Sequence, residues 1–79
     1  MRVDKFLKIA RLIKRRTVAK SAADGNRVSV NGKSVKPAYS LKIGDEITIT
    51  FGSSELKVRI KSLDEKTSRV SPESLYEVI

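Results

Sequence analysis

The hydrophobic pattern of the chain changes period once, and this change constrains the fold more than any other feature of the sequence. Over residues 2–24 the apolar side chains recur at the spacing of a helix face, which predicts a first helix that ends near Leu12 and a second helix over 18–24. From Arg27 onward apolar and polar residues alternate, which predicts short strands. We therefore expect an α+β fold, in which two short N-terminal helices pack on one side or end of a small, mainly antiparallel sheet of four to five strands.

Local signals mark the ends of the predicted elements. Thr17 is a suitable N-cap for the second helix, and Gly25 stands where the end of a helix favours a left-handed residue. Asn31 and Gly32 form the strongest short hairpin signal, because both positions of the tight turn need a positive φ. Later strands are predicted over 46–51, 55–60 and 76–79, with a polar loop over 64–70 and a helix start at Ser71.

The composition argues against most kinds of enzyme and membrane protein. The 79 residues contain no cysteine and no histidine, so neither the commonest general base nor the commonest metal ligand is available. No run of consecutive apolar residues exceeds two, which excludes a transmembrane helix. The tripeptide Gly32-Lys33-Ser34 lacks the upstream glycine of a phosphate-binding loop and is interpreted as part of the hairpin. We expect no catalytic residue, no metal site and no cofactor.

The positive charge of the chain is concentrated in its first half. The net charge is +8 overall, yet residues 1–42 hold twelve basic and two acidic residues, and residues 43–79 hold five basic and seven acidic ones. Such asymmetry favours a polyanionic partner, and structured RNA suits a chain with few aromatic residues better than unstacked single strands do. The predicted RNA contacts come from the two helices, their connecting turn and the hairpin: Arg2, Lys5, Lys8, Arg11, Lys14, Arg15, Arg16, Lys20, Asn31, Lys33 and Lys36.

Four side chains outside this set need an interpretation. Tyr39 lies in a basic loop, where it either packs over the hairpin or stacks on a base or ribose. Phe6 and Phe51 lie on apolar faces of their predicted elements and are expected in the core. Asp4 interrupts the basic face of the first helix, where it either complements the start of the helix or pairs with Lys8 one turn later.

Four spaced motifs in this pattern resemble the S4 RNA-binding domain. They are Arg2-Val3-Asp4-Lys5-Phe6-Leu7, Lys14-Arg15-Arg16-Thr17-x-Ala19, Gly25-x-Arg27-Val28-x-Val30-Asn31-Gly32 and Gly44-Asp45. The resemblance covers about residues 2–50, and the strand-rich tail over 51–79 is more generic. It implies one S4-type (alpha-L) domain over 1–79, whose fold agrees with the helix-helix-hairpin prediction.

The start MRVDKFLK, the run RLIKRRTVAK and the tail GDE…FG…YEV resemble a narrower group, the RqcP (YabO-type) family of bacterial ribosome-associated quality control. The resemblance implies a non-catalytic, cytoplasmic factor that binds the split large (50S) ribosomal subunit while it still carries peptidyl-tRNA. It also implies contacts with 23S rRNA and tRNA, and support of an RqcH-type factor that adds alanine tails to stalled nascent chains. Arg2 and Arg16 match the family's motif arginines, whereas Val3 replaces its commoner leucine. Nothing in the sequence indicates an obligate dimer, so we expect a monomer.

Three other interpretations are open at this point. A heat-shock-type S4 protein, which recycles large subunits blocked by nascent chains, usually carries an extended basic tail, whereas this chain ends at Ile79 in a mildly acidic region. An RNA-binding module of an RNA-modifying enzyme would need a much longer catalytic domain. A membrane-surface role would need the apolar face of the first helix, which we expect to cover the sheet instead.

Overall fold

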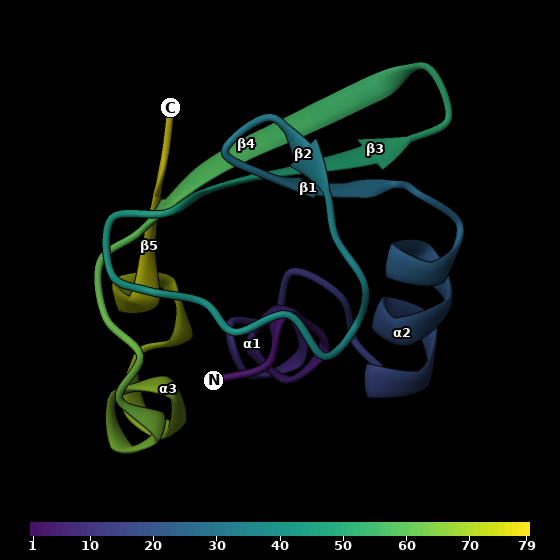
Figure 1. The fold of residues 1–79 in the computed structure, drawn as a ribbon. Helices are drawn as coiled ribbons and strands as arrows, with labels where there is room; N and C mark the ends of the chain where they lie inside the picture. The colour runs from purple at the N-terminus through teal and green to yellow at the C-terminus, as the bar shows by residue number, and fades with distance from the viewer.

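The computed structural model describes residues 1–79, and its elements follow the order expected from the two periods (Figure 1). The five-stranded sheet has the strand order β2-β1-β3-β4-β5, and all its neighbouring strands are antiparallel. The α+β prediction is therefore confirmed. The elements are α1 (Val3–Ile9), α2 (Arg16–Asp24), β1 (Val28–Val30), β2 (Lys33–Ser34), β3 (Glu46–Phe51), β4 (Ser54–Ile60), α3 (Glu65–Val70), the 3₁₀ helix η1 (Pro72–Leu75) and β5 (Tyr76–Val78).

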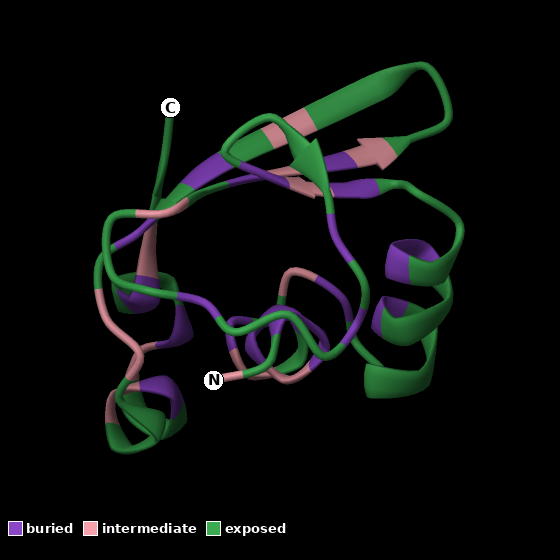
Figure 2. Cartoon of the chain, viewed as in Figure 1, coloured by how far each residue is buried: buried purple, intermediate pink, exposed green.

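One hydrophobic core lies between the helices and the sheet (Figure 2). Phe6 and Leu7 of α1 are fully buried, as are Ile47 of β3 and Ile60 of β4, and each such burial stabilises the fold by about 1.5–3 kcal/mol. The apolar face of α1 therefore covers the sheet, as expected. No helix is both long and apolar enough to cross a membrane.

The turn between β1 and β2 forms at Asn31 and Gly32, as predicted, with φ angles of 52° and 85°. The side chain of Asn31 also fastens this turn to the start of β3. Its amide nitrogen donates to the carboxylate of Asp45 at 3.1 Å, and its carbonyl oxygen accepts from the backbone N–H of Glu46 at 3.0 Å. Two of the spaced sequence motifs, Asn31-Gly32 and Gly44-Asp45, therefore meet in space.

Both predicted boundary residues of the second helix are wrong. The N-cap position, with extended backbone angles, is Arg15, so the helix begins at Arg16. Thr17 therefore lies inside the first helical turn. Gly25 has a φ of −85°, and the left-handed residue after the helix is Asn26, with a φ of 60°. Asparagine tolerates a left-handed conformation better than most residues, so this position after the helix does not need a glycine.

The predictions for the chain from Phe51 onward are wrong at two places. Residues 64–70, predicted as a polar loop, contain α3, and its N-cap Asp64 accepts a hydrogen bond from the backbone N–H of Lys66 at 2.9 Å. Phe51, expected in the core, is 48% exposed, because it lies at the end of β3 beside the turn of the β3–β4 hairpin, where it lines an open hollow next to α2 (Figure 1). The rest of the tail follows the prediction, since Pro72 begins η1 and Tyr76 begins β5.

Candidate RNA interface

A buried carboxylate joins the start of α1 to the start of α2. The side chain of Asp4 is only 3% exposed, and both of its oxygens have arginine partners. Arg2 donates from Nε to Oδ1 and from Nη2 to Oδ2, at 3.1 Å each, and Nε of Arg16 lies 3.4 Å from Oδ2. Because Arg2 precedes α1 and Arg16 opens α2, one carboxylate holds the guanidinium groups of two helices side by side.

The charge state of Asp4 suits this arrangement. Burial raises the pKa of its carboxyl group, but hydrogen bonds from Arg2, from the Lys5 backbone N–H at 2.8 Å and from Arg16 lower it by more. The net pKa therefore lies below the ordinary value of 3.8, and Asp4 is ionised at neutral pH. Arg2 and Arg16 stay 47% and 45% exposed, so their guanidinium groups are still accessible to the oxygens of a phosphate.

A small polar hollow lies over this carboxylate and extends along α2. Its lining consists of Arg2, Asp4, Arg16, Thr17 and Lys20. Lys20 follows Arg16 by one helical turn and therefore lies on the same side of α2. We call Arg2, Asp4, Arg16 and Lys20 the Asp4 cluster. It brings three of the predicted RNA contacts together around one buried anion.

A second hollow lies beside the β1–β2 hairpin and holds three more of the predicted contacts, Asn31, Lys33 and Lys36. Both lysines are exposed. Tyr39, which follows them in the loop after β2, is 41% exposed. We call this site the Tyr39 hollow. It is lined by Val30, Asn31, Lys33, Ser34, Val35, Lys36 and Tyr39.

The loop that carries Tyr39 is fixed to the segment that carries Arg2. The backbone N–H of Val3 donates to the carbonyl oxygen of Tyr39 at 2.9 Å, and Arg2 forms an isolated antiparallel bridge with Ser40. In Figure 1 this loop runs from β2 across α1. The Tyr39 hollow and the Asp4 cluster are therefore neighbouring parts of one surface.

Other predicted contacts lie toward acidic groups or have no partner in the protein. Lys5 forms an ion pair with Glu65 of α3, and its ammonium group lowers the pKa of that carboxyl. The pKa of Glu73 is lowered first by its own backbone N–H and a serine hydroxyl, and also by Arg11, which therefore lies toward the C-terminal tail. Lys8, Lys14 and Arg15 are exposed and have no ion-pair partner, and Arg11, which influences Glu73, forms no ion pair either.

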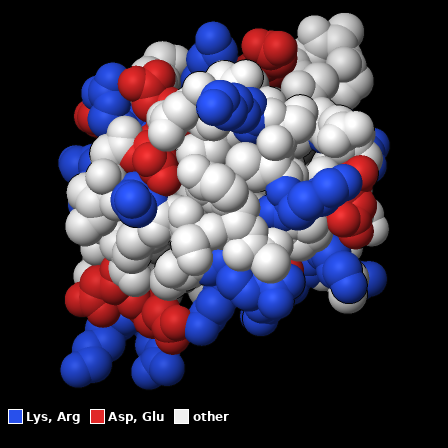
Figure 3. Space-filling model, viewed as in Figure 1, with Lys and Arg blue, Asp and Glu red and all other residues white.

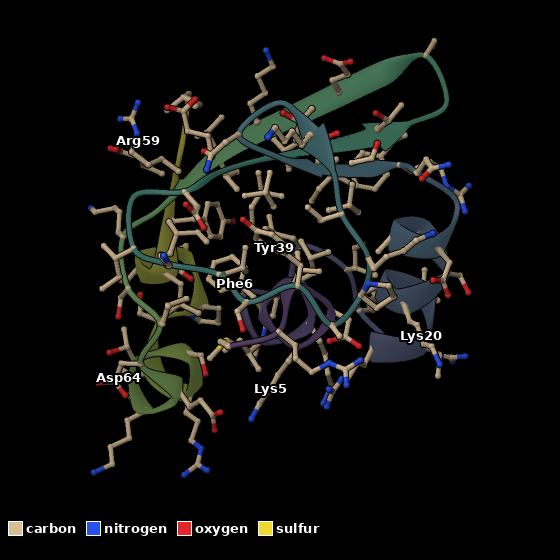
Figure 4. The ribbon with its side chains drawn as sticks, in the orientation of Figure 1. Lys5, Phe6, Lys20, Tyr39, Arg59 and Asp64 are labelled. Atoms are coloured by element: carbon tan, nitrogen blue, oxygen red, sulfur yellow. The ribbon has the colours of Figure 1, made fainter.

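The surface view shows the same separation. Lys and Arg side chains gather at the lower centre of Figure 3, between α1 and the start of α2, whereas acidic and basic side chains are mixed over α3 at the lower left. In Figure 4, Lys20 projects from α2 and Lys5 from the lower side of α1. The amide of Asn31 is held in place by one bond from its nitrogen to Asp45 and one to its oxygen from the backbone N–H of Glu46.

Sequence reasoning missed the roles of Asp4 and Thr17. Asp4 does lie in the first turn of α1, as one of its two interpretations holds, but the predicted pair with Lys8 is wrong because the carboxylate faces Arg2 and Arg16. The one sequence signal for this ion pair is the position of Arg2, two residues before an aspartate at the start of a helix. Thr17, predicted as a helix cap, instead lines the hollow of the Asp4 cluster.

Comparisons with known proteins show the family to which this fold belongs. The S4 domain family model matches residues 1–47. The RQC P-site tRNA stabilizing factor of Bacillus subtilis is 43% identical over 79 residues, which cover 100% of this chain and 92% of that protein. The factor of the same name from Halalkalibacterium halodurans is 45% identical over 78 residues, which cover 99% of this chain and 89% of that protein. The solved structure of heat shock protein 15 from Vibrio cholerae is 31% identical, with a TM-score of 0.89 over 100% of this chain and 81% of that chain.

These matches confirm the S4-type fold and the resemblance drawn from the sequence motifs. The family model covers more than half of the chain, and the tRNA stabilizing factors match nearly all of it. The chain therefore belongs to the S4 domain family and, within it, to the family of RQC P-site tRNA stabilizing factors.

Proposed function

We propose that this protein is a non-catalytic, cytoplasmic RNA-binding factor that binds the large ribosomal subunit and stabilises P-site tRNA during ribosome-associated quality control. In this proposal it acts as a monomer and contacts both 23S rRNA and the tRNA. It thereby supports an RqcH-type factor while that factor adds alanine tails to the stalled nascent chain. The similarity of 43–45% to factors named for P-site tRNA stabilisation supports this role.

The Asp4 cluster is the observation that carries the proposal. Arg2 and Arg16 are the two arginines that the motif resemblance singles out, and the structure brings them onto one buried carboxylate. Arginines that are already held in place lose less side-chain entropy when they bind a phosphate. A rigid basic surface of this kind suits RNA whose shape and phosphates are recognised, as in a ribosomal RNA or a tRNA.

The test is purification of the tagged protein from cells, followed by sedimentation and northern blotting of the RNA that it retains. The wild type is expected to recover large subunits with peptidyl-tRNA and few small subunits. Arg2→Ala and Arg16→Ala are expected to lose this association and to keep a native circular dichroism spectrum. Arg59→Ala is the matched control, because Arg59 is 44% exposed but pairs with Glu46 and Glu77 on the sheet (Figure 4).

Three results would contradict the proposal. Association that is undiminished in both Arg2→Ala and Arg16→Ala would remove the Asp4 cluster from the interface. An equal loss in Arg59→Ala would mean that total charge, and not this cluster, causes binding. Recovery of small subunits or free tRNA alone would leave the S4 fold intact but assign a different RNA partner.

A heat-shock-type role on blocked large subunits is the second candidate, and the TM-score of 0.89 to heat shock protein 15 favours it. The two roles differ in their product. Deletion of the gene should abolish alanine tails on stalled nascent chains if the protein stabilises P-site tRNA for tailing. Tails that persist at normal abundance in the deletion strain would favour the heat-shock-type role.

A further inference from the structure

Tyr39 presents an exposed aromatic ring on a loop whose backbone is fixed. Its N–H donates to the carbonyl oxygen of Lys36 at 3.0 Å, and its own carbonyl oxygen accepts from the N–H of Val3 at 2.9 Å. These bonds hold the main chain on both sides of the ring, while the residue is 41% exposed. An aromatic ring held open to solvent in this way is available for a partner, and the core does not require it.

We propose that the Tyr39 hollow binds one unpaired nucleotide of the RNA, with its base stacked on the Tyr39 ring and its flanking phosphates held by Lys33 and Lys36. The inference rests on the function proposed above and names a feature of the RNA that the protein recognises. That feature is a single unstacked nucleotide beside a paired stem.

The chemistry of the hollow fits such a nucleotide. A tyrosine ring stacks on the face of any base, and a lysine ammonium group is a compact point charge for a phosphate. Val30 and Val35, both buried, contribute an apolar part of the lining, which suits the flat face of a base. The hollow therefore combines a stacking surface with two cations at its edge.

The position of the hollow places it beside the Asp4 cluster. The backbone of Arg2 forms a β-bridge with Ser40, the neighbour of Tyr39. An RNA strand whose phosphates contact Arg2 therefore passes close to the Tyr39 ring. One N–H of the Asn31 amide donates to Asp45 and its carbonyl oxygen accepts from the backbone of Glu46, so this side chain is fixed at the edge of the hollow. We therefore expect the hollow to select for an unpaired nucleotide.

Intrinsic tyrosine fluorescence provides a direct test. The chain has no tryptophan and only two tyrosines, so Tyr76→Phe leaves Tyr39 as the sole tyrosine. Two RNA probes are used, a stem with one bulged nucleotide and the same stem fully paired. The bulged stem is expected to bind more tightly and to quench Tyr39, whereas the paired stem should leave its emission nearly unchanged.

Substitution of Tyr39 then separates stacking from general attraction. Tyr39→Leu is expected to weaken binding of the bulged stem roughly five- to 150-fold and to leave the affinity for the paired stem unchanged. Tyr39→Phe keeps the ring and should retain the preference for the bulge. Tyr39→Leu is expected to fold, because the bonds that fix the loop belong to the backbone.

Each contrary result has a distinct meaning. Equal affinity for both stems, or no quenching by the bulged stem, would overturn the stacking site and leave the proposed function standing. An equal loss on both stems in Tyr39→Leu would assign the ring a structural role and also overturn it. If the wild type binds neither stem and Arg2→Ala has no effect on ribosome association, both the inference and the proposed function fail.

Discussion

The substitution Asp4→Asn separates the positioning of the two arginines from the total charge of the protein. Asparagine keeps the shape of the side chain, removes its charge, and turns an NH₂ donor toward the guanidinium groups of Arg2 or Arg16. It also raises the net charge of the chain from +8 to +9. If long-range attraction alone governs RNA binding, affinity rises. If Asp4 positions Arg2 and Arg16, affinity falls.

The structure sets the expected loss of stability. Hydrogen bonds to a charged group contribute about 1.5–3 kcal/mol each, whereas ion pairs with exposed partners contribute about 0–1 kcal/mol. Arg2 and Arg16 are nearly half exposed, so their bonds to the buried Asp4 carboxylate fall between these limits. We expect a loss of about 2 kcal/mol. For a domain of this size, that corresponds to a fall in Tm of roughly 8–16 °C.

The expected loss of RNA affinity comes from the freedom that the arginines regain. Immobilising a side chain with many rotamers costs about 0.5–1.5 kcal/mol on binding, and two arginines must then be immobilised. The affinity of Asp4→Asn should therefore fall by about 1–3 kcal/mol, or roughly five- to 150-fold. This fall opposes the effect of the added positive charge.

The assay is equilibrium binding to large subunits or to a labelled RNA, at constant salt and well below the Tm of the variant. Asp24→Asn is the matched control, because Asp24 is an exposed residue of α2 and its substitution makes the same change in net charge. Affinity that is equal to or tighter than that of the wild type in Asp4→Asn, with Asp24→Asn unchanged, would refute the positioning argument.

Three further predictions follow from the structure. Burial raises the pKa of Asp4, but its hydrogen bonds lower it by more, so the pKa in the folded state lies below that in the unfolded state. The stability that Asp4 contributes is therefore complete above about pH 5 and is lost as the pH falls through the folded pKa. Asp4→Asn should flatten the fall in Tm between about pH 5 and pH 2. Phe6→Ala should cost about 3–5 kcal/mol in urea unfolding, and Phe51→Ala, at an exposed site, about 1 kcal/mol or less. Binding through the five cations of the Asp4 cluster and the Tyr39 hollow should give a log–log salt slope of about −4.5 on a paired RNA stem, compared with about −9 if all ten predicted cations contact phosphates.

The helices and the first hairpin could be predicted because their signals are local. Amphipathic periodicity places α1 and α2, and the Asn31-Gly32 dipeptide places the turn between β1 and β2. The helix α3 has no such periodicity, because it is short and buries only Ser68. Its one sequence signal is the capping side chain of Asp64, which is also typical of a turn.

The exposure of Phe51 and the ion pairs of Asp4 depend on contacts that are remote in the sequence. Alternation puts Phe51 on the same face of β3 as Ile49, but the packing of α2 leaves an open hollow there, which Phe51 and Val18 line. Asp4 is bonded to Arg2, two residues before it, yet its second arginine comes from α2. Periodicity predicts the face of an element on which a residue lies, whereas the packing of α2 determines which residues that face contacts.

Contacts between distant parts of the sequence also explain why the net charge of the N-terminal half overestimates the number of cations that are free to bind RNA. The acidic groups of the C-terminal half return to the basic half in space, since Glu65 of α3 pairs with Lys5 and Glu73 lies near Arg11. The Asp4 cluster differs, because its counter-charge is a single buried carboxylate shared by two arginines, which fixes them without neutralising both. A face that retains positive charge and fixed geometry is what phosphate recognition requires. We therefore expect the cations that bind RNA to be distinguished less by their number in the sequence than by which acidic group each one contacts after folding.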